Sequence, residues 1–246
     1  MNIKVQEIMS RVILSDKTIH IKLLGDSITH GVGGTGFEQN GEKIVDGFWR
    51  NPDGYCWANL FKNFMESQYN CTVTNNACSG ATIEFLLEHF DTLVSEEDDI
   101  IICMIGTNNR NASWDLGEKP VKAEFLKQFQ DKIVLLYEKL KALGKQVIFM
   151  ASVPSAKKGE YAEYNEEQRF WRIFHMNDVQ DAYVSASYKY GFPLICLYSP
   201  FLKACKDRNI DYETLLADGL HPNDKGYDLM FELILRGLGL AETLNK

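Results

Sequence analysis

Serine, aspartate and histidine stand in this 246-residue chain where together they could carry out acyl transfer. Ser27 lies in segment 25–31 (GDSITHG), directly after an apolar run. Asp218 and His221 stand three residues apart near the end of the chain. At that spacing the carboxylate can accept a hydrogen bond from one ring nitrogen, which leaves the other nitrogen free to act as a general base. These residues form a candidate nucleophile, orienting carboxylate and base.

Two further segments offer hydrogen-bond donors for a negatively charged oxygen. Gly80 lies within 75–82 (NNACSGAT), where a glycine beside the start of a helix presents free backbone N–H groups. Asn108 lies within 106–110 (GTNNR), and its side-chain amide supplies two donors without carrying charge. Together with the serine and the aspartate–histidine pair, these segments provide the nucleophile, the base and the oxyanion donors that acyl transfer needs.

Taken singly, each segment also has a purely structural interpretation. The polar residues of segment 25–31 could merely cap the following helix, and His221 could be a surface residue near a helix start. Segment 75–82 could be a plain turn between a strand and a helix, and the asparagines of 106–110 are favoured turn residues. The combination of the four segments, each placed after a predicted strand or near the C-terminus, favours catalysis.

Short apolar runs upstream of these segments predict the strands of a parallel sheet. Continuous apolar runs suit strands that are covered on both faces. Helical patterns alternate with the runs, and this alternation predicts a three-layer α/β domain in which ligands bind at the carboxyl ends of the strands. The predicted strands are residues 20–24, 72–74, 99–105, 146–150 and 193–197.

Apolar residues at steps of three and four predict the helices between the strands. In the longest of them, Pro120 suits the first turn and Gly144 suits the position just past the C-terminal end. Apolar positions from Val121 onward are expected to face the core. The predicted helices are residues 55–69, a helix that begins at 83, residues 120–143, a helix within 165–190, and residues 222–238.

The charge balance limits the classes of partner. The chain carries 26 basic and 34 acidic residues, a formal net charge of −8. An acidic chain repels phosphate backbones and anionic lipid, so we expect neither nucleic acid nor a membrane among its partners. No apolar run approaches the ~20 residues that span a bilayer, and the first residues do not resemble a signal peptide. We therefore expect a cytoplasmic protein that folds as a single domain, residues 1–246.

The cysteines and the scattered histidines do not predict a metal site. The six cysteines form no Cys-x-x-Cys pair, and without a secretion signal they are expected to be reduced. His175 and Asp178 fit a pair on a helix surface better than a set of metal ligands. We expect neither a metal nor an organic cofactor.

The four segments, in their order along the chain, resemble those of the GDSL/SGNH hydrolase family of esterases and lipases. The matching blocks are 25–29 (GDSIT), 79–82 (SGAT), 106–109 (GTNN) and 218–222 (DGLHP), and they span most of the chain. The resemblance implies a flavodoxin-like five-stranded parallel sheet with the site at its carboxyl edge. That fold agrees with the strand prediction made from the apolar runs.

The resemblance also implies a role for each site residue. Ser27 would be the nucleophile and His221 the general base, oriented by Asp218. The N–H of Ser27, the N–H of Gly80 and the side-chain amide of Asn108 would form the oxyanion hole. Such a site would form and hydrolyse an acyl-enzyme.

The chain departs from the family pattern at one position. Family members often have aspartate after the asparagine of the third block, and this chain has Asn109. Because the oxyanion role rests on Asn108, we expect activity to be retained and the packing of the local loop to differ.

Other functions remain open at the level of sequence. The glycines of 31–36 (GVGGTG) match a dinucleotide-binding motif, but the residues that follow read as a loop and not as the required helix. A catalytically silent carbohydrate-binding domain would share the fold, and an acyltransferase would share the catalytic residues. An α/β-hydrolase is not predicted because the chain has no Gly-x-Ser-x-Gly motif.

Loops at the carboxyl edge are expected to set the substrate. Their aromatic side chains suit stacking on sugar rings, although the same residues could simply pack the loops; the sugar interpretation is slightly favoured. We expect a small acyl group, with acetyl as the first choice, on a carbohydrate or a similar polar alcohol; no oligomeric state is predicted. The aromatic residues are Phe37, Phe48, Trp49, Tyr55, Trp114, Tyr161 and Tyr164.

Overall fold

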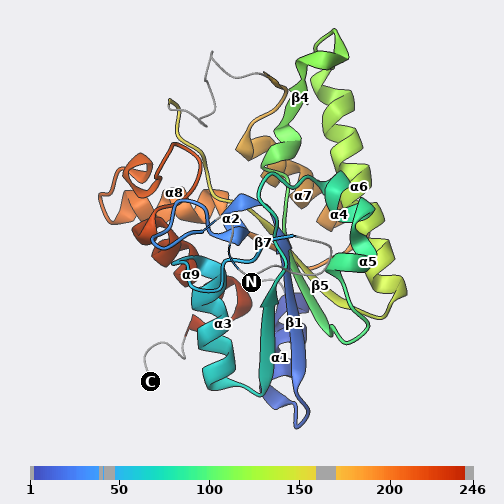
Figure 1. Ribbon diagram of the computed structural model, residues 1–246, viewed down its shortest axis with the longest axis vertical. Coiled ribbons are helices and arrows are strands. Elements are labelled where there is room, and N and C mark those ends of the chain that lie inside the picture. Colours follow the sequence, from blue (N-terminus) through green and yellow to red (C-terminus); the bar gives the residue numbers. More distant parts are fainter. Residues whose placement is uncertain (1–2, 39–40, 42–47, 159–169, 242–246) are drawn as a thin grey trace.

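Strands and helices alternate along the chain in the computed structural model, which describes residues 3–38, 41, 48–158 and 170–241 (Figure 1). The strands are β1 (Ile19–Gly25), β2 (Cys71–Asn75), β3 (Ile100–Met104), β4 (Asn111–Ser113), β5 (Gln146–Ala151), β6 (Phe170–Arg172) and β7 (Leu194–Cys196). The α-helices are α1 (Ile3–Leu14), α2 (Ser27–His30), α3 (Trp57–Gln68), α4 (Ile83–Glu88), α5 (Phe90–Leu93), α6 (Lys122–Ala142), α7 (Met176–Tyr190), α8 (Tyr198–Asp207) and α9 (Asp224–Leu238). Short 3-10 turns are η2 (Asn108–Arg110), η3 (Trp114–Leu116) and η4 (Tyr212–Leu215).

Five parallel strands form the main sheet in the order β2-β1-β3-β5-β7. In the register of β1, Ile21 stands between Val73 of β2 and Ile100 of β3. This order is the flavodoxin-like one, in which the chain reverses direction across the sheet next to β1. The predicted α/β fold with a five-stranded parallel sheet is confirmed, and all five predicted runs supply its strands.

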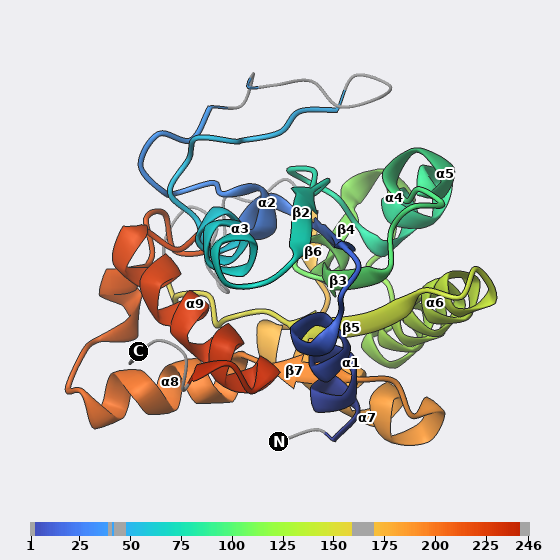
Figure 2. The same cartoon turned by 90° about the horizontal axis from the view of Figure 1, so that it is seen from below.

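The two faces of the sheet are buried against different helices. Along β3, Ile100 and Ile102 enter a core shared with α1, α3, α8 and α9, whereas Ile101 and Cys103 enter a core shared with α4, α5, α6 and α7. Figure 2 shows α3, α8 and α9 to one side of the strands and α4 to α6 to the other. Burial on both faces explains why the strands are apolar at every position and not at alternate positions.

Helix ends differ from the prediction by a few residues. The long helix α6 begins at Lys122, so Pro120 precedes it, and the predicted core position Val121 is 59% exposed. Gly144 has the predicted place after the helix, with a φ of 75° that favours glycine. Likewise α9 begins after Asn223, whose side chain accepts a hydrogen bond from the N–H of Gly226, and Pro222 stands outside it.

Several elements were not predicted. Helix α1 packs on the sheet through its buried face, and α8 follows β7. Of the helix predicted within 165–190, only α7 is helical among the described residues, because Phe170–Arg172 forms strand β6, which pairs antiparallel with β4. Residues 165–169 lie outside the described part of the chain.

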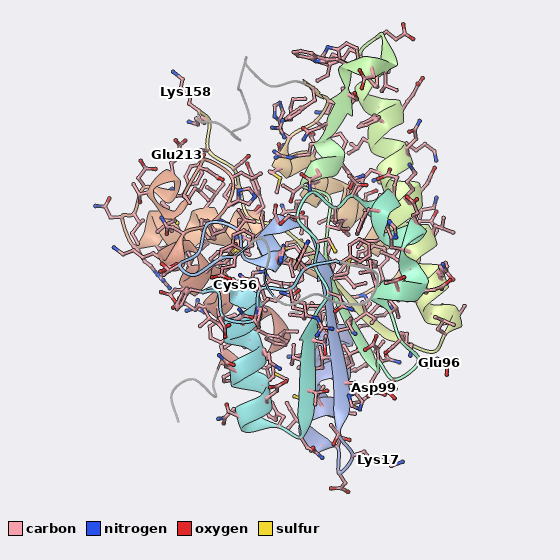
Figure 3. All side chains as sticks on the ribbon, viewed as in Figure 1. Lys17, Cys56, Glu96, Asp99, Lys158 and Glu213 are labelled. Carbon is pink, nitrogen blue, oxygen red and sulfur yellow. The ribbon has the colours of Figure 1, made fainter. Side chains whose placement is uncertain are left out.

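The two ends of the sheet have different surroundings. Lys17, which precedes β1, and Asp99, which precedes β3, lie at one end of the molecule, and Lys158, which follows β5, lies towards the other (Figure 3). The predicted site segments that contain Ser27, Gly80 and Asn108 follow β1, β2 and β3 and therefore belong to the carboxyl end, whereas the segment with Asp218 and His221 follows α8 and η4. All six cysteines are free thiols. None of the described helices combines the length and the apolar character that a membrane span requires.

Candidate active site

The nucleophile candidate stands where β1 turns abruptly into α2. Ser27 is the first residue of α2, and the side chain of Asp26 caps the helix by accepting a hydrogen bond from the N–H of Ile28 at 3.0 Å. Gly25 makes the turn possible, because a Cβ there would lie 2.4 Å from the hydroxyl of Thr29. The capping role considered for this segment is therefore real, but it belongs to Asp26 and leaves the Ser27 hydroxyl available.

Asp218, His221 and Ser27 form one hydrogen-bonded chain of side chains. His221 Nε2 lies 2.8 Å from Ser27 Oγ, although 194 residues separate the two, and His221 Nδ1 lies 2.6 Å from Asp218 Oδ2. The other carboxylate oxygen of Asp218 accepts hydrogen bonds from the backbone N–H groups of Leu220 and His221 at 3.0 and 2.9 Å. The structure thus brings together the three residues predicted for proton transfer and nucleophilic attack.

Burial and hydrogen bonds set the pKa values of the two aspartates near Ser27. Burial alone would raise the pKa of Asp218, but the hydrogen bonds from the ring and backbone of His221 outweigh burial and lower it. Asp218 therefore stays ionised, as a carboxylate that orients an imidazole must. Burial raises the pKa of the fully buried Asp26, against the opposing effects of Thr107 and Ile28. Asp26 lies next to the nucleophile but is not part of the hydrogen-bonded chain.

The glycine-rich segment 31–36 packs against His221, the base candidate of the site. Gly31 ends α2 with a φ of 110°, and at Gly33 (φ 93°) a Cβ would lie 3.0 Å from the Cβ of His221 and 2.6 Å from the carbonyl oxygen of Pro222. Thr35 donates to both carboxylate oxygens of Asp224, the first residue of α9. The glycines therefore permit close packing of the loop against the histidine, which differs from the helix start that a dinucleotide motif requires.

The donor candidates lie on neighbouring loops. Cys78, in the Gly80 loop, donates a backbone hydrogen bond to Gly25 at 3.1 Å, which places this loop beside the end of β1. Gly80 is exposed and has a φ of 80°, with open space where a side chain would be. Asn108 Nδ2 donates to the carbonyl of Ala81 at 2.9 Å, so the Asn108 side chain reaches the loop that contains Gly80.

Asn109 has a structural role next to these donors. Its side-chain oxygen accepts a hydrogen bond from the N–H of Ile83 at 3.0 Å, and its side-chain nitrogen donates to Glu84 Oε2 at 2.7 Å. The residue that departs from the family pattern therefore holds the start of α4. Figure 1 shows α4 on the same side of the sheet as α6.

Several aromatic residues expected to line the substrate cleft pack the loops instead. Phe37 contacts His30 edge-on at a centroid distance of 5.2 Å, and Phe48 contacts Phe85 and His89 at 5.1 and 5.0 Å. Trp114, in η3, is 49% exposed. Tyr161 and Tyr164 lie outside the described residues.

Sequence reasoning missed two buried polar residues beside the site. Arg110 is 1% exposed; its Nε donates to the carbonyl of Thr107 at 2.8 Å and its guanidinium reaches Ser155 Oγ at 3.3 Å. Ala156, which follows Ser155 in the loop after β5, donates to the carbonyl of Gly219 at 2.7 Å. Through Ser155 and Ala156, the loop after β3 is connected to the loop of the catalytic histidine candidate. The second residue is His30, which is 3% exposed. Both residues lie within the quoted segments, but their contacts depend on distant parts of the chain.

Among the described residues, no group of three or more His, Cys, Asp or Glu side chains is arranged to hold a metal ion. His175 and Asp178 lie at the start of α7, where the backbone N–H of the histidine donates to the carboxylate at 2.8 Å.

A family model described as the GDSL-like lipase/acylhydrolase family matches residues 23–229 of the chain. The match contains all the site segments and extends into α9. A comparison with curated proteins gives no match.

Solved structures of the same fold extend over nearly the whole chain. A protein from Parabacteroides merdae described as a GDSL-like lipase superposes with a TM-score of 0.66 at 18% identity, over 93% of this chain and 99% of its own. Axe2, an acetylxylan esterase from Geobacillus stearothermophilus, gives 0.63 at 19% identity, over 91% and 95%. The acetyl xylan esterase AlAXEase gives 0.60 at 19% identity, over 89% and 98%. At these identities the likeness concerns the fold.

Proposed function

The chain belongs to the GDSL-like lipase/acylhydrolase family, and from this premise we propose that it is a serine esterase that removes a short acyl group, acetyl above all, from a carbohydrate or a similar polar alcohol. The observation that carries the proposal is the 2.8 Å contact between His221 Nε2 and Ser27 Oγ. On the other side of the ring, His221 Nδ1 lies 2.6 Å from Asp218 Oδ2. This arrangement is the one in which a base can take the proton of an attacking hydroxyl. Membership in the family makes the protein a carboxylic ester hydrolase.

In the first half of the proposed reaction, the Ser27 hydroxyl attacks the ester carbonyl carbon and His221 Nε2 takes its proton. The carbonyl oxygen becomes an oxyanion, which accepts hydrogen bonds from the N–H groups of Ser27 and Gly80 and from Asn108 Nδ2. The tetrahedral intermediate then collapses, and the bond to the alcohol breaks as His221 returns the proton to the departing oxygen. The products at this stage are the free alcohol and an acyl group bound to Ser27.

In the second half, water replaces the alcohol. His221 takes a proton from the water as the water oxygen attacks the carbonyl carbon of the acyl-enzyme. The second tetrahedral intermediate then collapses, the bond between that carbon and Ser27 Oγ breaks, and His221 returns the proton to Ser27 Oγ, which releases the carboxylic acid and regenerates the hydroxyl. Throughout both halves Asp218 remains a carboxylate, because its hydrogen bonds hold its pKa below the ordinary value despite burial. It therefore stabilises the imidazolium form of His221 in each transition state.

Two observations support acetyl as the acyl group and a sugar as the alcohol. Two of the solved structures with this fold are, by their names, acetyl xylan esterases, although their low identity limits the comparison to the architecture. The indole of Trp114 is half exposed in η3, on the loop that follows the Asn108 segment, and an exposed aromatic face suits a sugar ring.

Replacement of Ser27 tests the catalytic part of this proposal. Ser27→Ala should abolish hydrolysis of p-nitrophenyl acetate while the circular dichroism spectrum stays unchanged. Ser187→Ala, on α7 and remote from the site segments, is a matched control that should keep its activity. Full activity in Ser27→Ala would overturn the proposal.

A series of p-nitrophenyl esters tests the acyl group. We expect kcat/KM to be highest for acetate and to fall with chain length. Faster cleavage of octanoate than of acetate would contradict the short-acyl assignment but would leave the serine mechanism intact. Release of acetate from acetylated xylo-oligosaccharides would then test the carbohydrate.

A further inference from the structure

A buried histidine joins the helix of the nucleophile to the loop of an oxyanion donor. His30 Nδ1 lies 2.8 Å from Ser79 Oγ, and the two residues are 49 positions apart. His30 is the last residue of α2, whose first residue is Ser27, and Ser79 directly precedes Gly80. The contact therefore connects two segments that the proposed reaction requires to be aligned.

The Gly80 loop has few restraints on its outer side. Ser79 and Gly80 are both exposed, and a Cβ on Gly80 would meet no atom within 4 Å. On the inner side, Cys78 donates to Gly25 and Ala81 donates to Cys78, each at 3.1 Å. These two backbone bonds flank the Ser79–Gly80 peptide but do not touch it, so its orientation depends on what holds the Ser79 side chain.

His30, in contrast, is held firmly. Its backbone N–H donates to Asp26 at 2.9 Å, and its carbonyl accepts from Asn51 Nδ2 at 3.2 Å. Its ring also packs against Phe37 in a T-shaped contact. Burial lowers the pKa of His30 against the opposing effect of the Arg50 backbone, so the neutral ring is favoured and one ring nitrogen can accept a hydrogen bond.

We infer that His30 and Ser79 are positioning residues, whose hydrogen bond fixes the Ser79–Gly80 peptide so that the Gly80 N–H points to the oxyanion. The inference rests on the proposed function, because it assigns a task within that reaction. Oxyanion donors act only when they are placed in advance where charge develops, and loss of one donor typically lowers kcat by about 100- to 1,000-fold. A donor that is present but loosely oriented should lose a part of that effect.

The hydrogen bond between His30 and Ser79 can be removed by a substitution at either residue, and it can be restored by asparagine at position 30. Ser79→Ala removes the hydroxyl of an exposed residue, so the fold should be unaffected. His30→Leu removes the ring nitrogen and keeps an apolar group in the buried position, whereas His30→Asn places an amide close to the position of Nδ1. We expect kcat for p-nitrophenyl acetate to fall about tenfold in Ser79→Ala and His30→Leu, as a fraction of the full donor effect, with KM little changed.

Three further measurements distinguish a positioning role of His30 and Ser79 from a general loss of protein stability. The Ser79→Ala/His30→Leu double variant should be no slower than either single variant, because both remove the same bond. His30→Asn should recover most of kcat. Affinity for phenylboronic acid, which forms a tetrahedral adduct on serine, should fall in parallel with kcat. The control Ser187→Ala removes a hydrogen bond to Phe192 of 2.7 Å and should change the melting temperature without changing kcat.

The possible outcomes distinguish a failure of this inference from a failure of the proposed esterase function. Full activity in Ser27→Ala would overturn the proposed function itself. Inactive Ser27→Ala together with normal kcat in Ser79→Ala would overturn the positioning role and leave the esterase assignment intact. Additive losses in the double variant, or losses confined to KM, would likewise contradict the inference.

Discussion

Asn109 joins the loop after β3 to the start of α4 through Glu84: its side-chain nitrogen donates to Glu84 Oε2 at 2.7 Å, and the other oxygen of Glu84 pairs with Lys132 Nζ at 2.6 Å. Asn109 is 7% exposed, so an aspartate in its place would set a nearly buried carboxylate against that of Glu84, whose side chain is 45% exposed. The proximity of the Glu84 carboxylate therefore explains why asparagine is favoured at position 109 of this chain, where aspartate is expected from the family pattern.

Asn109→Asp should consequently reduce stability more at neutral pH than at acidic pH. Two adjacent carboxyl groups raise the pKa of one of them in the native state, so the native state binds more protons than the unfolded state and stability falls as pH rises through that raised pKa. We expect the free energy of unfolding at pH 7.5 to fall by about 1–3 kcal/mol, as for a buried polar group left unpaired. Urea denaturation at pH 5 and pH 7.5 measures the difference.

The control for this prediction is the double variant Asn109→Asp with Glu84→Gln. The glutamine amide can donate to the new aspartate, so stability at pH 7.5 should return towards that of the wild type. Turnover of p-nitrophenyl acetate should change little in both variants, since Asn108 is untouched. Wild-type stability of the single variant at pH 7.5 would contradict the explanation.

Asn108→Ala should affect catalysis far more than folding. Loss of one oxyanion donor lowers kcat by about 100- to 1,000-fold, whereas loss of the hydrogen bond to Ala81 costs only about 1 kcal/mol of stability. Steady-state kinetics and thermal denaturation of the same preparation separate the two effects. Asn109→Ala provides the contrast, because it should lose stability and keep most of kcat. A large rise in KM with kcat unchanged would argue for substrate binding instead of oxyanion stabilisation.

Gly80→Ala and Gly144→Ala form a matched pair. Both glycines have a left-handed φ, 80° and 75°, and open space around the Cβ position, so each substitution should cost about 1 kcal/mol of backbone strain and cause no steric clash. Gly144 follows α6, at the end of the sheet remote from the site, and its variant should keep full kcat. Gly80→Ala should lose at least tenfold in kcat, because strain relief moves an oxyanion donor. Equal activity in the two variants would mean that the Gly80 N–H is not used.

Asp26→Asn should make the protein more stable at neutral pH. Burial raises the native pKa of Asp26, so folding penalises its ionised form, and this penalty grows as pH rises from the ordinary aspartate pKa through the raised one. Asparagine caps helices about as well as aspartate and carries no charge, so the hydrogen bond to Ile28 is kept. Denaturation curves from pH 4 to pH 8 should show the stability gain of the variant increasing with pH. A gain that shrinks with rising pH would have the wrong sign for a buried carboxylate.

The sequence predicts the layered architecture well because burial on both faces makes each strand of the main sheet a continuous apolar run. Helix ends are less predictable, since they depend on single caps such as Asn223, which starts α9 later than Pro222 suggests. Helix α8 contains Pro200 in its first turn, where proline is tolerated although it weakens the helical pattern. The short β4–β6 pair depends on a contact between segments some 60 residues apart, and a strand of three residues carries too little pattern to be recognised.

Ser27 and Asn108 each follow a strand of one parallel sheet, so their meeting at its carboxyl edge could be predicted from the apolar runs. The Asp218–His221 pair follows α8 and η4 and not a strand, so its place beside Ser27 was predicted from the residue types and from the resemblance to the family. The supporting contacts could not be predicted in the same way. His30 meets Ser79, and Arg110 meets Ser155, only through the tertiary fold. Phe37 illustrates the same limit, since its aromatic side chain suits a sugar platform but packs against His30 instead.

Covalent labelling tests the central claim, that the Ser27 hydroxyl is the nucleophile, most directly. A fluorophosphonate probe reacts with an activated serine and releases fluoride, and peptide mass spectrometry then locates the adduct. We predict one adduct, on the peptide that contains Ser27, with labelling abolished in Ser27→Ala and strongly slowed in His221→Ala. Unlabelled wild-type protein, or an adduct that persists in Ser27→Ala, would contradict the account.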